Sequence, residues 1–398
     1  MTSKPRNIPA SYDSVALVVP VTVPYSRFSE HGAQWYVGRA LAELVNSAGI
    51  EKADIDGLAV SSFTLAPDSV ITLTQYFSLT PRWIEQIPLG GASGVVALRR
   101  AARAVQSGDA EVIACIGADT NKKEGFRELV ENFSTFSAAA AYPYGAPGPN
   151  GAFSLITQHY MDKFGARRED FARIALAQRH NAQAYEHALI KKPLSLDDYL
   201  DARPIAGPLH MFDCVMPCAG AEAFLVMSVD RAKSLKLPYV EIRAADELHN
   251  AYSDEDAVQY RAGWKTFAPA MYERAGVGPK DMDLLYTYDD YPVISMMQME
   301  DLGFCAKGKA AEFTRVNPLT WDGGGLVHNS SGGQLSCGQA GSAAGYMGVV
   351  EALRQLTGSA LGQQVANARR ATVSGYGMIN YDRGLCATAA VLETGGVQ

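Results

Sequence analysis

Two runs of small residues, far apart in the chain, place the strongest constraint on the fold. Residues 90–94 (GGASG) come directly before a helical pattern over 95–106, and the Gly-, Ser- and Ala-rich residues 332–345 come directly before one over 346–356. Small side chains let another backbone or a ligand approach closely. Each helix start also supplies unpaired N–H groups and a partial positive charge. The chain is therefore predicted to repeat one structural plan in two halves.

Strand patterns accompany both units and alternate with helices. Helical spacing of apolar residues is found over 33–48 in the first half and over 262–275 in the second. Alternating strands and helices predict an α/β fold with parallel or mixed sheets. We expect an N-terminal half over 1–235 and a C-terminal half over 236–398. The predicted strands are 14–21, 56–62, 111–117, 221–228, 240–245, 284–288, 372–377 and 386–392.

Residues from about 120 to 210 interrupt this alternation. A Pro- and Gly-rich segment, 142–151 (YPYGAPGPNG), is predicted to be a loop, and helical patterns follow over 152–164 and 169–187. The interruption predicts an inserted loop domain that covers one face of the first half.

Charge and composition exclude several classes of partner. The formal charge of −7 comes without a basic stripe, which argues against nucleic-acid binding. No apolar run reaches the roughly 18 residues of a membrane span, and the first residues show no apolar signal region. Of the six cysteines only Cys214 and Cys218 lie close together, whereas a structural zinc takes four ligands. We therefore expect a cytoplasmic protein with reduced cysteines, no bound metal and no membrane contact.

Three segments resemble the thiolase superfamily. Residues 90–119 (GGASGVVALRRAARAVQSGDAEVIACIGAD) resemble the segment in which the nucleophilic cysteine of thiolases begins a Cys-Ala-Ser-Gly motif. Residues 328–345 (HNSSGGQLSCGQAGSAAG) resemble the Asn-x-x-Gly-Gly … Gly-His-Pro-x-Gly-x-x-Gly motif, and 301–313 (DLGFCAKGKAAEF) is most similar to the sterol-carrier-protein-x branch. The resemblance implies the thiolase fold, with duplicated βαβαβαββ halves in five α-β-α-β-α layers.

The catalytic positions of that family are changed. Gly91 matches the nucleophilic cysteine, Gln339 the histidine, and Gly375 the second cysteine. The Asn-Glu-Ala-Phe motif is replaced by 288–291 (YDDY). A thiolase needs a covalent acyl carrier and a base. The resemblance therefore excludes the standard thiolase reaction for this chain.

A thioester enolate is the intermediate that the altered site would suit. The N–H groups of Gly91 and Gly377 match the donors of a thiolase oxyanion hole, and such donors also stabilise an enolate. Glycine at both cysteine positions is predicted to open volume for a substrate with a β-hydroxyl group. The pattern resembles the steroid side-chain aldolases, thiolase-fold proteins that lack these cysteines and use tyrosines. This implies retro-aldol cleavage of a β-hydroxyacyl-CoA by a carbon–carbon lyase.

Five residues are candidates for proton transfer or hydrogen bonding in this site. Tyr288 is the first choice because it replaces the Asn of the Asn-Glu-Ala-Phe motif, and Asp289 is the nearest group that could change its pKa. Tyr346 is a second proton-transfer candidate, with core packing as the alternative. Gln339 could bond a thioester carbonyl or a water. His328 could titrate near neutrality, although a buried structural histidine is the competing interpretation.

The coenzyme A contacts follow only from the resemblance. In thiolases the loop domain and the small-residue turns form the pantetheine tunnel, which implicates 142–151 here. The side chain of Tyr376, between two glycines, is expected to line the pocket. The corresponding turn residues are Ser330, Ser331, Gly332 and Gly333.

The resemblance also implies partners. Coenzyme A enters as part of the substrate, and no other cofactor is expected. Thiolase-fold proteins pair through their sheets, which predicts a homodimer, and the cysteine-less branch adds a small OB-fold partner that usually carries a zinc ribbon. Two alternatives stay open: a non-nucleophilic subunit of a heteromeric thiolase or acyltransferase, and an acyl-CoA or lipid-binding module.

Overall fold

The computed structural model describes residues 11–123, 125, 134–145, 148–255 and 257–396. Within these ranges, ten strands form one sheet, and two short strands, β5 and β6, form a second. The first five strands of the large sheet have the order β3-β2-β4-β7-β1, and the last five have the order β10-β9-β11-β12-β8. The strands are β1 Val15–Ser26, β2 Gly57–Ser61, β3 Trp83–Gln86, β4 Val112–Asp119, β5 Pro204–Ala206, β6 Leu209–His210, β7 Ala219–Ser228, β8 Tyr239–His249, β9 Leu284–Tyr286, β10 Val327–His328, β11 Arg370–Asn380 and β12 Arg383–Thr394.

The pairing directions show that the two halves have the same topology. In the first half β2 runs parallel to β3 and β4, and β7 and β1 follow as antiparallel strands. In the second half β9 runs parallel to β10 and β11, and β12 and β8 follow in the antiparallel direction. Residues 16–18 of β1 pair with 239–241 of β8 and join the halves. The predicted duplication is therefore confirmed.

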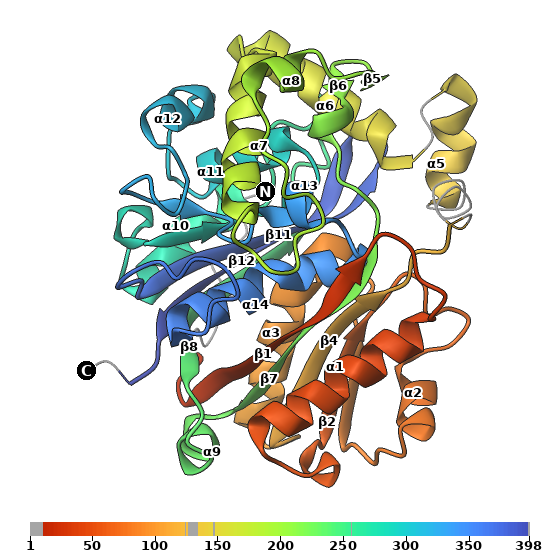
Figure 1. Ribbon diagram of the computed structural model, residues 1–398, viewed down its shortest axis with the longest axis vertical. Coiled ribbons are helices and arrows are strands. Elements are labelled where there is room, and N and C mark those ends of the chain that lie inside the picture. The colour runs from red at the N-terminus through yellow and green to blue at the C-terminus, as the bar shows by residue number, and fades with distance from the viewer. Residues whose placement is uncertain (1–10, 124, 126–133, 146–147, 256, 397–398) are drawn as a thin grey trace.

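The helices and the two halves of the large sheet form five layers, and three hydrophobic clusters fill the spaces between them. One cluster surrounds the central helices, and one lies beneath each outer helix layer. Alternate side chains of β1 point to opposite faces: Ala16 and Val18 pack with α1, whereas Val15 and Leu17 pack with α3 and α14. Helices α3 and α14 lie side by side between the two halves of the sheet (Figure 1). The outer face of the C-terminal strands is covered by α10 and α11. The order of helix and sheet layers confirms the predicted thiolase fold.

The helices follow largely from apolar spacing and glycine stops. Helix α1 covers the predicted range and ends at Gly49, which adopts a left-handed conformation with a φ of 64°. Within the described ranges, no helix has the length and apolar character that crossing a membrane would require. The helices are α1 Ala33–Ala48, α2 Val70–Tyr76, α3 Ser93–Ser107, α5 Thr135–Ala140, α6 Gly148–Phe164, α7 Arg168–Ala182, α8 Leu196–Leu200, α9 Val229–Ser234, α10 Trp264–Ala275, α11 Pro292–Asp301, α12 Ala310–Val316, α13 Gly333–Cys337 and α14 Ala344–Thr357.

The chain between β4 and β7 carries α5 to α8, and α6, α7 and α8 lie at the top of the view (Figure 1). Two sequence predictions here are wrong. The predicted loop 142–151 ends early because α6 begins at Gly148, with Pro149 in its first turn, where a missing N–H is tolerated. The predicted helix 169–187 ends at Ala182, beyond which the chain turns to bury Tyr185 beside Cys337. Residues 146 and 147 lie outside the described residues.

Candidate active site

A cavity lies beyond the carboxyl ends of the parallel strands of both halves. Segments after β2, β4 and β9, together with the later part of β11, meet there with the turns that precede α3 and α14. Ligands of open α/β sheets bind at this edge. The wall is formed by Phe63, Thr64, Gly90, Gly91, Asp119, Thr120, Asn121, Pro149, Phe153, Val215, Pro217, Cys218, Tyr288, Asp290, Tyr291, Gln339, Gly341, Tyr376, Met378 and Ile379.

The ring of Tyr288 fills the space beside Gly91. A Cβ atom added to Gly91 would overlap Cε2 and Cζ of that ring and the carbonyl oxygen of Tyr376. A Cβ at Gly375 would lie 2.6 Å from the carbonyl oxygen of Gly91 and 2.7 Å from Oγ1 of Thr388. The prediction that the two glycines leave open volume is therefore wrong. A tyrosine ring and closely packed backbone occupy the space that cysteine side chains would need.

Tyr288, Asp290 and Gln339 form a polar triangle on the cavity wall. The Gln339 amide donates from Nε2 to the Tyr288 hydroxyl at 3.1 Å and to Oδ1 of Asp290 at 2.5 Å, and the Tyr288 hydroxyl also bonds the Asp290 carboxyl. Burial and the neighbouring Asp290 hold the pKa of the Tyr288 phenol well above its ordinary value. Burial also raises the pKa of Asp290 to about 8. At neutral pH Tyr288 is thus a hydrogen-bond donor, and Asp290 is the group that changes charge.

Asp289 faces the start of α13. Its carboxylate accepts the backbone N–H groups of Gln334 at 3.1 Å and Leu335 at 3.2 Å. Burial raises its pKa to about 7. Among the residues that the structure describes, Asp290 rather than Asp289 stands in the cavity wall beside Tyr288. Asp289 holds the turn in place, and its effect on Tyr288 stays a prediction.

Tyr346 and His328 lie in the core behind the cavity. Tyr346, in α14, is fully buried between the sheet halves, and its hydroxyl bonds Oγ of Ser61 at 2.9 Å. His328, in β10, is also fully buried, with Nε2 at 2.7 Å from Oγ1 of Thr287. Burial lowers the pKa of His328 to about 3, so the ring is neutral at physiological pH. These positions favour the structural interpretation of both residues.

The predicted coenzyme A turn is buried as well. The Ser330 hydroxyl donates to Glu351 at 2.8 Å and therefore accepts from the Tyr286 hydroxyl at 2.8 Å. Ser331 is buried, and its carbonyl accepts from the Cys337 thiol at 3.1 Å. A Cβ at Gly332 would meet the backbone and side chain of Ala182, and one at Gly333 would meet Asp289. The turn supports the site from behind, and its contact with coenzyme A stays a prediction.

The two predicted oxyanion donors have different surroundings. Gly91, in the turn before α3, lies in the cavity wall. Among the described residues of β11, the wall is formed by Tyr376, Met378 and Ile379 rather than by Gly377. A Cβ at Gly377 would overlap the carbonyl oxygen of Leu89, so this glycine permits the close packing of the turn on β11. The pair of donors stays a prediction.

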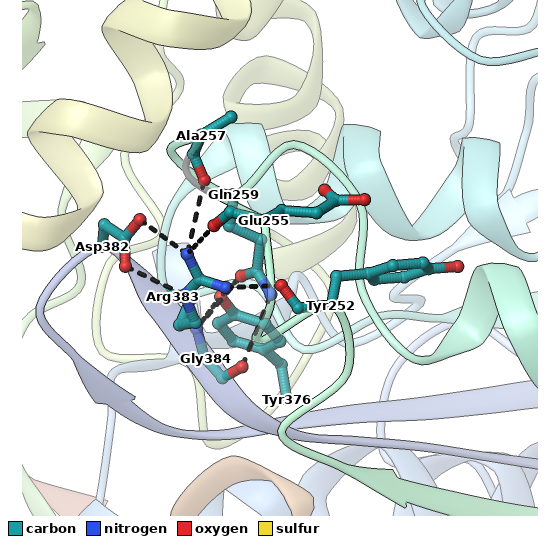
Figure 2. Close-up of polar contacts among 8 residues, drawn as sticks. All are labelled: Tyr252, Glu255, Ala257, Gln259, Tyr376, Asp382, Arg383 and Gly384. Carbon is teal, nitrogen blue, oxygen red and sulfur yellow. Dashed lines mark hydrogen bonds and ion pairs between the residues drawn. The ribbon is translucent and has the colours of Figure 1, made fainter. Parts of the chain in front are cut away.

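Tyr376 lines the cavity with its ring, while its hydroxyl group is held from behind. The hydroxyl donates to Oε1 of Gln259 and accepts the N–H of Gly384 at 2.6 Å. Figure 2 shows this contact below the guanidinium group of Arg383. Arg383 donates to the carbonyl oxygens of Tyr252, Glu255 and Ala257. The loop after β8 is thereby fastened to β12, and Tyr376 becomes a fixed wall.

Several cavity residues were not predicted from the sequence. Asp290 was visible only as the second aspartate of the motif at 288–291. Phe153, from α6, stacks on Tyr291 with a distance of 4.1 Å between ring centroids. Asp119 accepts from Ser62, Thr64 and the backbone at the end of β2, and from the N–H of Ser342. These residues come from segments far apart in the chain, and no local pattern marks them as neighbours.

Comparison with known proteins identifies the family. The model of the thiolase C-terminal domain-like family matches residues 244–391. The steroid side-chain-cleaving aldolase of Thermomonospora curvata is 30% identical over 341 residues, which cover 81% of this chain and 85% of that protein. This chain belongs to the side-chain-cleaving aldolase family of the thiolase superfamily. The resemblance found in the sequence is thus confirmed.

Two further relatives support this family membership. The 17-hydroxy-3-oxo-4-pregnene-20-carboxyl-CoA lyase of Mycobacterium tuberculosis is 29% identical over 358 residues, covering 85% of this chain and 90% of that one. The solved structure of the Ltp2-ChsH2(DUF35) aldolase superposes with a TM-score of 0.81 at 26% identity, covering 96% of this chain and 98% of that one. The three matches cover between 81% and 96% of this chain.

Proposed function

We propose that this protein is an acyl-CoA aldolase, a carbon–carbon lyase that cleaves a β-hydroxyacyl-CoA by a retro-aldol reaction. The observation that carries the proposal is the place of Tyr288 in the cavity. Its ring fills the space in which a thiolase cysteine at position 91 would stand, and its hydroxyl joins Asp290 and Gln339. The site offers proton-transfer groups in place of an acyl carrier.

A retro-aldol cleavage needs only groups of the kind present in this wall. The proton of the substrate's β-hydroxyl leaves, the C–O bond becomes a carbonyl, and the Cα–Cβ electron pair moves into the thioester as an enolate. Protonation at Cα then gives the shorter acyl-CoA. A hydrogen-bond donor aimed at the enolate oxygen contributes about 3 kcal/mol, and the N–H of Gly91 is our candidate donor.

The thiol in the cavity does not supply an alternative nucleophile. Cys218 lies in the wall but is only 2% exposed, and burial together with Glu222 raises the pKa of its thiol. A nucleophilic cysteine instead needs a lowered pKa from a neighbouring cation or helix start. The acyl-transfer chemistry of a thiolase is thus disfavoured even though one cysteine reaches the cavity.

A large apolar acyl group matches the character of the wall. Phe63, Phe153, Val215, Met378 and Ile379 contribute apolar side chains. The names of the two aldolase and lyase relatives specify steroid side chains and a steroid CoA thioester. We therefore propose a steroid or similar lipid side chain, carried as a CoA thioester, as the substrate.

We also propose the assembly and the compartment. The thiolase fold supports a homodimer. The second component in the name of the Ltp2-ChsH2(DUF35) relative supports a partner protein, which we propose to be a small OB-fold protein. A reducing compartment such as the cytoplasm suits the six cysteines, all of which are free thiols.

The test is a cleavage assay with 17-hydroxy-3-oxo-4-pregnene-20-carboxyl-CoA, followed by mass spectrometry. The expected products are a steroid ketone and a shorter acyl-CoA, in equal amounts. The matched control substrate lacks the 17-hydroxyl group and should stay intact, because no carbonyl can form. If no β-hydroxyacyl-CoA is cleaved, with or without a co-purified OB-fold partner, while a cysteine-bearing thiolase companion restores thiolysis, the protein is a thiolase subunit instead.

A further inference from the structure

Asp290 lies in the middle of the candidate active site, but the reaction steps described above give it no role. Its carboxyl lies in the cavity wall between Tyr288 and Gln339, four residues after the end of the parallel strand β9. Next to it, Tyr291 also lies in the wall, and its hydroxyl donates to Oδ1 of Asn150, which also accepts from the Cys214 thiol. The carboxyl is therefore close to any substrate that enters the cavity.

The hydrogen bonds around Asp290 fix the orientation of its carboxylate in the cavity wall. Gln339 donates to its Oδ1 at 2.5 Å, and the Tyr288 hydroxyl donates to the same carboxyl. Gln339 also donates to the Tyr288 oxygen at 3.1 Å, which fixes the direction of the phenol proton toward Asp290. A phenol that is itself donating to a carboxylate is poorly suited to act as the base.

We infer that Asp290 is the general base that takes the β-hydroxyl proton of the substrate, and that Tyr288 and Gln339 position its carboxylate. This inference rests on the proposed aldolase function. The O–H proton passes to the Asp290 carboxylate as the Cα–Cβ bond breaks and its electron pair enters the thioester enolate. The Asp290 carboxylic acid then returns that proton to Cα, so the enzyme ends in its starting state.

Burial keeps the affinity of Asp290 for protons high, and none of the five titratable groups that face it carries a positive charge that would oppose it. The groups that face it are Asp289, Tyr288, Tyr291, Cys214 and Tyr376, from three different parts of the chain. None of these five groups is a cation, and burial, together with the neighbouring Asp289, raises the pKa of Asp290 to about 8. A base of this affinity works near the pH of the cell and can also return its proton to carbon.

The test is the pH dependence of kcat/KM for steroid β-hydroxyacyl-CoA cleavage. In the wild type, kcat/KM should rise with pH up to about 8, because only the ionised carboxylate accepts the proton. Asp290→Asn should lower the rate about 10²–10⁴-fold and abolish the rise of kcat/KM with pH, which is the acidic limb of the profile. Asp290→Glu should recover part of the rate and part of this limb. Tyr288→Phe should keep the limb but move it to higher pH, because the phenol's hydrogen bond lowers the pKa of Asp290.

A second readout does not depend on carbon–carbon cleavage. Exchange of the α-hydrogens of the acyl-CoA product in D₂O requires the same proton carrier, and Asp290→Asn should abolish it. Asp246→Asn is the matched control. Asp246, on β8, pairs with Arg274 of α10 away from the cavity wall, and removing its charge should leave the pH profile unchanged.

The outcomes separate the two proposals. If the wild type cleaves the substrate but Asp290→Asn, shown to be folded by its thermal midpoint, keeps the rate and the acidic limb, Asp290 is not the base and the aldolase function stands. If Tyr288→Phe removes the limb and Asp290→Asn does not, the phenol is the base. If the wild type cleaves no β-hydroxyacyl-CoA, both proposals are overturned.

Discussion

The close packing of Tyr288 on Gly91 can be tested with one added methyl group. In Gly91→Ala the new Cβ would lie more than about 1 Å inside the usual 3.5–4.0 Å separation, against the Tyr288 ring and the Tyr376 carbonyl oxygen. The ring can rotate or shift, but the carbonyl belongs to β11 and cannot move without disturbing the sheet. Overpacking of this kind costs about 1–3 kcal/mol, and we expect a value near the upper end.

The expected shift follows from the size of the chain. Unfolding entropy of about 2.1 cal/mol/K per residue over 398 residues makes 3 kcal/mol equivalent to a fall of about 4 °C in Tm. A displacement of the Tyr288 hydroxyl by about 1 Å should also lower kcat/KM for β-hydroxyacyl-CoA cleavage about 10²-fold. Differential scanning calorimetry and the cleavage assay measure the two effects on the same sample.

Two variants complete the experiment. Gly325→Ala is the control, since an added Cβ meets nothing within 4 Å there, and it should keep or slightly raise Tm. Adding Tyr288→Ala to Gly91→Ala should recover part of the lost stability relative to the sum of the single changes, because the ring contact is gone and the carbonyl contact persists. A Gly91→Ala protein with the Tm and activity of the wild type would show that the ring does not occupy this space.

Three further predictions concern groups around the cavity. Gln259→Leu leaves the buried Tyr376 hydroxyl proton without its acceptor, while the Gly384 N–H keeps its bond to the Tyr376 oxygen; stability should fall by about 1–3 kcal/mol in chemical denaturation, whereas removal of the phenol oxygen by Tyr376→Phe should cost less. Glu222→Gln should stabilise the protein at pH 8 by about 2–3 kcal/mol but have little effect at pH 4. The reason is that burial raises the pKa of Glu222 to about 7, so the wild type loses stability as the pH rises from about 4.5 to 7; equal effects at both pH values would contradict this. Because burial lowers the pKa of His328 to about 3, the neutral ring is favoured in the folded state, and stability should fall as the pH drops from about 6.5 to 3. That fall should be smaller in His328→Gln, as pH-dependent thermal melts would show.

Much of the scaffold could be predicted because its signals are local. Helix α1 has the predicted bounds, since apolar spacing and the stop at Gly49 are properties of adjacent residues. Eight strands of the large sheet were predicted, although β1 and β11 extend further than predicted because sheet pairing, and not composition, sets where a strand ends. The short edge strands β3 and β10 were missed. The end of α7 at Ala182 was missed for a similar reason: the burial of Tyr185 by a distant segment ends the helix.

The same distinction between local sequence signals and tertiary packing applies to the site. The absent cysteines and histidine, at Gly91, Gln339 and Gly375, are facts of the sequence, and they alone exclude a covalent acyl carrier at these positions. Whether those positions are empty or filled depends on β9 and β11 lying against the turn before α3, and only the tertiary structure shows the Tyr288 ring in that space.

The roles of neighbouring residues were also decided by the fold. Asp289 and Asp290 are identical in type and adjacent in sequence, so nothing local distinguishes them. Their side chains leave the backbone in different directions, and Asp289 bonds the start of α13 while Asp290 enters the cavity. The sequence by itself determined the chemistry that this protein lacks. The tertiary structure decided which carboxyl faces the substrate, because direction, burial and partners are set by residues far away in the chain.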